Sequence, residues 1–232
     1  MTFSAIQGAA NSGDATPVSS LSAAGSAIAS GNFVLGSAAC GGIGNFVSVT
    51  DDKGNTYGHT ASTAHSDGAG EAFGFYLFNI TSAPSIITIN MLANTLFPSI
   101  VWNEFHSTAG ASLGPIAANA ETSTTTTATS GNANILVANS LVYGVTVNEG
   151  NSFAISPGSG YTFGEDLETS GNGFVASEWQ LAVGTGNIAA TFTSVVADLW
   201  ITFLLSVAPG FITPVPIALT SGTKQIIART VG

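Results

Sequence analysis

The chain has 232 residues, of which 45% are hydrophobic and 7% are charged, and its formal net charge is −10. It has only three Lys and Arg residues, which excludes a nucleic-acid groove, because phosphate binding needs clustered cations; the same scarcity excludes binding to an anionic membrane surface. The single cysteine, Cys40, excludes an internal disulfide. The sequence contains no run of 18 apolar residues, so no membrane-spanning helix is predicted. No signal peptide is expected at the start of the chain.

Residues 1–30 are rich in Ala, Gly and Ser and are expected to form an N-terminal arm or an edge strand. From Asn32 onward, short runs of β-branched and aromatic residues are separated by turn residues, a pattern typical of β-strands. Long helices are not expected, because Gly and turn pairs recur too often. In the first half of the chain, strands are predicted at residues 33–35, 46–50, 73–78, 86–89 and 100–102.

A stretch rich in Ala, Ser, Thr and Asn, residues 107–134, interrupts this pattern and could hold one edge strand in its Thr run. Apolar runs then resume. In the second half, strands are predicted at residues 135–137, 141–143, 145–147, 153–155, 179–183, 190–193 and 199–205.

The two sets of strands resemble each other in order and spacing, at an offset near 100 residues. Asn45-Phe46-Val47-Ser48-Val49 matches Ser152-Phe153-Ala154-Ile155, and the aromatic run that begins at Phe75 matches the one that begins at Glu178. The predicted fold is therefore an all-β, jelly-roll-like sandwich over residues 31–208, built from two similar halves at about 31–108 and 135–208. Neither half has enough apolar runs for a core of its own, so one shared core is expected. Its aromatic members are predicted to be Tyr76, Trp102, Trp179 and Trp200.

Residues 209–232 are expected to form a C-terminal tail. Pro209-Gly210 ends the last strand, and the tail carries two of the three basic residues and no acid. A positive, apolar tail on an acidic body could be an edge strand of its own domain, or an arm exchanged between subunits. The candidate assembly residues are Ile217, Leu219, Lys224, Ile226, Ile227 and Arg229.

Neither a catalytic site nor a metal or cofactor site is predicted. His59 and His65 lie in a Gly/Ala/Ser loop with Ser62, Ser66 and Asp67, but the Gly-x-Ser-x-Gly motif of serine hydrolases is absent and the spacing is not that of zinc sites. Asp51-Asp52-Lys53-Gly54-Asn55 is explained as a turn, although its oxygens could also bind calcium.

Two acidic residues lie next to strand cores, Glu104 and Glu178. A glycosidase needs two carboxylates about 5–9.5 Å apart in one cleft, and this pair would be the starting point for such a hypothesis. Strand alternation instead places each on a solvent-facing side.

Residues 47–57 read Val-Ser-Val-Thr-Asp-Asp-Lys-Gly-Asn-Thr-Tyr. With the later runs Phe75-Tyr76-Leu77-Phe78, Ile87-Thr88-Ile89 and Val101-Trp102-Asn103-Glu104-Phe105, this motif resembles a β-sandwich module of phage structural proteins, including capsid decoration proteins, and of bacterial extracellular proteins. The resemblance covers about residues 30–206. It implies a jelly-roll-like sandwich with an attachment or coat role, and it supplies no catalytic residues.

The leading functional hypothesis is a structural virion protein of a bacteriophage: a capsid decoration (cement) protein, or a related coat or tail component. Its expected partners are further copies of itself, with a trimer favoured by analogy, and a major capsid protein. The alternative is an extracellular carbohydrate-binding or adhesive module, in which Tyr57 and Tyr161, at matched places in the two halves, stack on sugar rings.

Overall fold

The computed structural model describes residues 3–13, 16–148, 154–167 and 174–210. Within these ranges the protein consists of β-strands joined by turns, without a helix, and every strand pairing is antiparallel. The prediction of an all-β protein is confirmed.

The strands of the first half follow one another closely along the chain. They are β1 (Phe3–Ser12), β2 (Val18–Ala24), β3 (Phe33–Gly41), β4 (Phe46–Asp51), β5 (Gly58–His59), β6 (Thr63–Ala64), β7 (Gly70–Leu77), β8 (Ile86–Thr95) and β9 (Ser99–Ser107). The N-terminal segment contributes two of them: β1 lies at the edge of a large sheet beside β9, and β2 pairs with β8.

The second part of the chain begins with a strand that was not predicted. Its strands are β10 (Ala111–Ala120), β11 (Thr125–Thr129), β12 (Ala133–Ile135), β13 (Leu141–Asn148), β14 (Ile155–Pro157), β15 (Thr162–Leu167), β16 (Phe174–Leu181), β17 (Gly186–Ile188), β18 (Thr191–Asp198) and β19 (Trp200–Pro209). The edge strand expected in the Thr run of residues 107–134 is present as β11, whereas β10 and β12 were not predicted. The small residues of this stretch lack the apolar signal of a strand because β10 and β11 lie at sheet edges and bury little of their surface.

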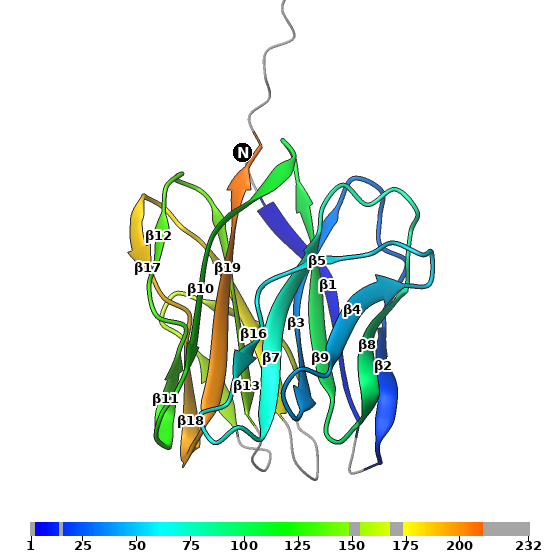
Figure 1. Cartoon of the computed structure of the whole chain (residues 1–232). Coiled ribbons are helices and arrows are strands. Elements are labelled where there is room, and N and C mark those ends of the chain that lie inside the picture. The colour runs from blue at the N-terminus through cyan, green and yellow to red at the C-terminus, as the bar shows by residue number, and fades with distance from the viewer. Residues whose placement is uncertain (1–2, 14–15, 149–153, 168–173, 211–232) are drawn as a thin grey trace, which may run out of the picture.

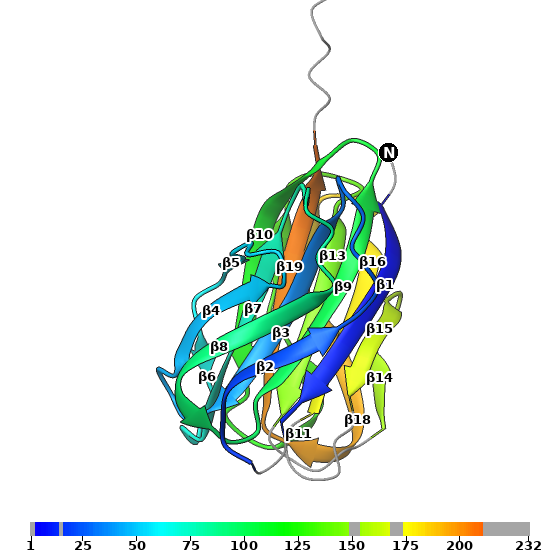
Figure 2. The same cartoon turned by 90° about the vertical axis from the view of Figure 1, so that its right-hand side faces the viewer.

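The sheets stack in four layers (Figure 1). Two large sheets face each other in the middle, β1-β9-β3-β7-β5 with β6 beside β7, and β10-β19-β13-β16-β15. The small sheet β2-β8-β4 covers the outer face of the first, and its strands cross that sheet obliquely (Figure 2). The two-stranded sheet β12-β17 and the three-stranded sheet β11-β18-β14 cover the outer face of the second large sheet.

The hydrophobic core is divided among these layers, so the expectation of one shared core is wrong. A central cluster lies between the two large sheets and includes Phe33, Phe105, Tyr143 and Phe203. Each large sheet also packs on its outer small sheet, with Trp102 in one of these clusters and Trp200 in another. Strands β3, β9, β13 and β19 are therefore buried on both faces, which explains their nearly continuous apolar sequences.

The four aromatic residues predicted for the core lie in or against it. Trp102 and Trp200 are buried, and half-buried Tyr76 and Trp179 pack against the central cluster. The ring of Phe105, from the first half, contacts Tyr143 and Trp179 of the second at centroid distances of 5.8 and 6.1 Å. The two halves thus share aromatic contacts at the centre of the molecule.

Candidate functional site

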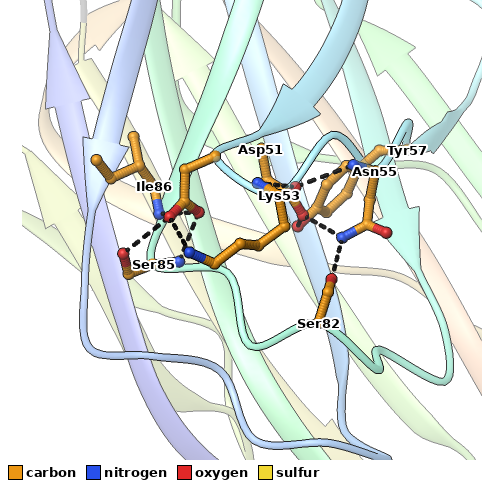
Figure 3. Close-up of polar contacts among 8 residues, drawn as sticks. Asp51, Lys53, Asn55, Tyr57, Ser82, Ser85 and Ile86 are labelled. Carbon is orange, nitrogen blue, oxygen red and sulfur yellow. Dashed lines mark hydrogen bonds and ion pairs between the residues drawn. The ribbon is translucent and has the colours of Figure 1, made fainter.

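The motif at residues 47–57 forms a turn that is closed by one carboxylate (Figure 3). Oδ1 of Asp51 accepts hydrogen bonds from the backbone N–H groups of Lys53 and Asn55 at 2.9 and 3.0 Å. Oδ2 accepts from Nδ2 of Asn55 at 2.8 Å and from the hydroxyl of Tyr57 at 3.3 Å. Nδ2 of Asn55 also donates to Oγ of Ser82, at 2.7 Å, which ties the turn to a neighbouring loop.

The next acid, Asp52, fixes the same turn to the start of β8, at the Ser85 and Ile86 labelled in Figure 3. Its Oδ1 accepts from the backbone N–H groups of Ser85 and Ile86 at 2.9 and 3.2 Å, and Oδ2 lies 3.2 Å from Nζ of Lys53. The bond from Ser85 is the main cause that lowers the pKa of Asp52 to about 2, against the opposing effect of burial. Protein donors occupy both carboxylates, so the geometry favours a structural turn over a calcium site.

A cavity lies where the ends of several strands meet. Its volume is about 520 Å³. The end of β3, the start of β7, the β8–β9 turn and the end of β13 form its walls, so both halves contribute to it. Its lining residues are Ala39, Cys40, Gly41, Gly42, Asn45, His65, Ala69, Gly70, Glu71, Asn94, Thr95, Leu96, Phe97, Ser99, Val147 and Asn148.

An ionised carboxylate, Glu71, lies in the cavity wall. Burial opposes its ionisation, but hydrogen bonds from the backbone of Phe46, Gly44 and Asn45 and from the Ser62 side chain outweigh burial, so its pKa lies below the ordinary value. Oε1 accepts from the N–H groups of Asn45 at 2.9 Å and Phe46 at 3.1 Å. Protein donors thus stabilise the ionised form of Glu71, which keeps its negative charge.

The other two titratable groups of the cavity are uncharged near neutral pH. Burial, the Glu71 charge and the hydrogen bond to that carboxylate, whose Oε1 lies 3.9 Å from Sγ, raise the pKa of the Cys40 thiol to about 12. Burial lowers the pKa of His65, against smaller opposing effects of Asp67 and Asp198. A protonated thiol and a neutral imidazole give the cavity no cation and no activated nucleophile.

Two residues that line the cavity each carry a buried polar atom without a protein partner. Oγ of Ser99 and Oδ1 of Asn148 are the only buried side-chain nitrogen or oxygen atoms without a hydrogen bond in the described part of the chain, and both residues are 1% exposed. Buried polar atoms are almost always bonded, so two such atoms in one cavity need an explanation.

The rim of the cavity is apolar and conformationally constrained. Leu96 and Phe97 line it at the β8–β9 turn, and Phe97 adopts a positive φ of 53°, which is rare for a bulky side chain. Exposed Ile43, Val47 and Leu92 lie on neighbouring segments: the N–H of Leu92 donates to the carbonyl of Asn45, next to Phe46 and Val47.

The tyrosines predicted to stack on sugars differ in their surroundings. Tyr57 is only 2% exposed and packs edge-on against Phe75, so the expectation that its ring is exposed is wrong. Tyr161 is half-buried, packs against an outer core cluster and donates from its hydroxyl to the carbonyl of Ala189 at 3.0 Å. The hydroxyl of Tyr57 has a partner in Asp51, which allows the whole ring to be buried.

Glu104 and Glu178 are buried, which corrects the expectation that they face solvent. Glu104 accepts from Nε2 of Gln7, the N–H of Ala29 and Nδ2 of Asn32. Glu178 accepts instead from the N–H groups of Gly158 and Thr191, at 2.7 and 3.0 Å. The two carboxylates bind different segments in separate halves and neither lines a cavity described above, so this geometry does not support a glycosidase pair.

The other predicted candidates do not converge on one site. His59 is exposed and its Nδ1 lies 2.9 Å from the carbonyl oxygen of Thr60, whereas Asp67 is exposed and accepts from the N–H of Ala69. Within residues 3–13, 16–148, 154–167 and 174–210, no group of three or more His, Cys, Asp or Glu side chains is placed to bind a metal ion. The candidate assembly residues lie outside the described residues: Ile217, Leu219, Lys224, Ile226, Ile227 and Arg229.

Sequence reasoning missed Glu71, Ser99 and Asn148. The available signal was weak: Glu71 precedes the predicted aromatic strand as Gly70-Glu71-Ala72, and the other two flank apolar runs. Their proximity depends on long-range pairing. Ala39 faces Ser99 across β3 and β9, whereas Asn148 ends β13 in the other large sheet.

Comparisons with known proteins give no match: no family model, curated protein or solved structure is similar to this chain. Among the described residues, no helix is long and apolar enough to cross a membrane.

Proposed function

We propose that the chain is a structural protein of a bacteriophage particle, a capsid decoration protein or a related coat or tail component, which acts as a homo-oligomer. The observation that carries the proposal is the surface chemistry of this all-β body. Throughout the described residues the single ion pair is Lys53–Asp52, and Lys53 is the only Lys or Arg. A surface with few charged residues can pack against further protein without removing many ions from water.

Exposed apolar side chains on the outer layers support the same proposal. Leu92 on β8 is 75% exposed, Val195 on β18 is 75% exposed and Val183, between β16 and β17, is 94% exposed. They lie on both outer sides of the four-layer body, so contacts on more than one face can be formed. A particle component must contact several neighbours at once.

We further propose that the body is a jelly-roll-like sandwich unit present twice. The strand order β1-β9-β3-β7-β5 has a counterpart in β10-β19-β13-β16-β15, and β2-β8-β4 has one in β11-β18-β14. The pairing irregularities support this proposal independently of strand order. The shift in β1 between Ala5 and Gln7 has a counterpart in β10 between Leu113 and Ile116.

A second pair of irregularities lies in the small sheets. The register between β2 and β8 shifts after Val18, which pairs with Thr95, and the register between β11 and β18 shifts after Thr125, which pairs with Asp198. Because bulges bend and twist a strand at a chosen place, similar bulges in corresponding strands favour two copies of one unit over two unrelated sandwiches.

The C-terminal tail is proposed to strengthen assembly as an exchanged arm. The last described residue, Gly210, donates from its N–H to the carbonyl of Gly110, and Phe3 pairs with Ser107 nearby. Gly210 therefore lies at the end of the body where β1 begins. The apolar, basic composition of residues 217–229 suits an acidic neighbour of the same kind.

Particle association tests the function. An epitope-tagged chain would be expressed in phage-infected host bacteria. Particles would then be purified on a density gradient and examined by mass spectrometry. The proposal expects the chain in the particle fraction in a fixed ratio to the major coat protein. Recovery only from the particle-free fractions would contradict it.

A further inference from the structure

We propose that the cavity at the ends of β3, β7 and β13 is a binding site for a small neutral sugar or polyol. This inference does not depend on the particle assignment. It differs from the sugar-stacking hypothesis of the sequence, because it involves neither Tyr57 nor Tyr161. It rests on the two unpartnered polar atoms, the charge of the lining residues and the apolar walls.

The unpartnered atoms define what a ligand must supply. Nδ2 of Asn148 donates to Oδ2 of Asp198 at 3.2 Å, which orients the amide and leaves Oδ1 as a free acceptor. This acceptor requires an O–H or N–H from the ligand. Oγ of Ser99 can either donate or accept. A purely apolar ligand would leave both atoms unsatisfied and would gain no binding free energy from them.

The lining residues select against charged ligands. No Lys or Arg lines the cavity, and the ionised Glu71 would repel an anion. A cation would have to compete with two backbone N–H groups for Oε1 of Glu71. Hydroxyl groups are therefore the donors that fit this cavity best.

The rest of the wall suits the C–H face of a sugar ring. Ala39, Leu96, Phe97 and Val147 contribute apolar surface, and Phe97 supplies an aromatic side chain. A volume of about 520 Å³ lies within the range of small-molecule sites, which are mainly apolar with a few fixed polar groups. A sugar could direct its ring hydroxyls toward Ser99 and Asn148 and its C–H face toward Phe97. It would then match both the polar and the apolar parts of the wall.

Calorimetric titration of the full chain tests the proposal, with glucose, galactose and N-acetylglucosamine as neutral probes and glucuronate as the anionic probe. We expect saturable binding of at least one neutral probe at one site per chain. Glucuronate is expected to bind roughly tenfold more weakly than glucose if glucose is the probe that binds. Absence of binding by all three neutral probes would overturn the proposal.

Two variants locate the binding site. Ser99→Ala removes one unpartnered oxygen and should weaken binding roughly tenfold without loss of fold. Ala69→Trp, at an exposed lining position, should block the cavity while the core is unchanged. The matched control is Ser37→Ala on the same β3–β9 sheet: Oγ of Ser37 already donates to the carbonyl of Phe73, and Ser37 does not line the cavity. Equal affinity in all three variants would place the sugar elsewhere and overturn the proposal.

Discussion

The hydroxyl of Tyr57 donates to Oδ2 of Asp51 at 3.3 Å, and this contact buries the ring beneath the turn that Asp51 closes. The motif Thr-Asp-x-x-Gly-Asn-Thr-Tyr is thereby explained by local structure. The aspartate accepts from the turn, the glycine adopts a positive φ of 83°, the asparagine reaches a neighbouring loop, and the tyrosine anchors the turn to the core.

Loss of this carboxylate should destabilise the fold. Asp51→Ala removes the acceptor for Lys53, Asn55 and Tyr57, and we expect the free energy of unfolding to fall by about 2–3 kcal/mol. Urea unfolding followed by circular dichroism measures this. Asp67→Ala is the control, because Asp67 is exposed and accepts from one N–H; its effect should stay below about 1 kcal/mol. Equal effects of the two substitutions would contradict the assigned role of Asp51.

The free energy of unfolding should decrease as pH rises, because Glu178 loses its proton in the folded state. Burial raises the pKa of this carboxyl to about 7, although the N–H groups of Gly158 and Thr191 partly oppose the shift. Between pH 4.5 and about 7 the folded state retains a proton that the unfolded state releases, so the contribution of Glu178 to stability is fully present below pH 4.5 and is lost as pH rises through 7. The loss is at most roughly 3 kcal/mol.

The matched variant Glu178→Gln isolates this effect. The free energy of unfolding of the variant should not show the decrease with pH that Glu178 causes. The lowered pKa of His65 makes the free energy of unfolding increase with pH, and it does so equally in both proteins. The difference in unfolding free energy between wild type and variant should therefore change in favour of the variant from pH 5 to pH 8. A difference that stays constant over this range would refute a raised pKa.

The single thiol should be unreactive in the folded protein. Cys40 is buried and its pKa is raised to about 12, so little thiolate is present at pH 8. Ellman's reagent is expected to modify Cys40 only after urea unfolding, and the urea-unfolded chain serves as the positive control. Rapid modification of the native chain would show that the cavity wall opens.

The two halves should unfold together because they share aromatic contacts. Phe105→Ala removes the ring that contacts Phe33, Tyr143 and Trp179 and should cost about 3–5 kcal/mol. Tryptophan fluorescence and far-UV circular dichroism should shift by the same amount and remain superimposable. Two separate transitions would instead indicate halves that are stable alone.

The sequence predicts much of the fold because the central strands are continuous apolar runs. Residues 33–35 and 100–102 fall within β3 and β9 as expected, and the predicted run 199–205 lies within β19 except for its first residue. The number of layers could not be predicted in this way, because alternation assumes that one side of a strand faces water. Strands β9 and β16 are covered on both sides, and this is why Glu104 and Glu178 are buried rather than exposed.

The cavity that contains Ser99 and Asn148 could not be predicted from the sequence for a different reason. Ser99 and Asn148 are ordinary polar residues at strand ends, and their interest lies only in a missing partner. That property depends on how the β8–β9 turn and the end of β13 meet, across long separations in sequence. By contrast, Asp51 and its partners are local, so the sequence predicts their turn directly.

Sedimentation velocity of the full chain and of a chain ending at Gly210, which retains every described strand, tests the assembly claim most directly. A discrete oligomer of the 23.2 kDa chain is expected, with a trimer favoured. It should persist from about 0.1 M to about 1 M salt, since few ion pairs are available to hold it, and the shortened chain should assemble more weakly. A full-length chain that sediments as a monomer at all concentrations, indistinguishable from the shortened one, would contradict it.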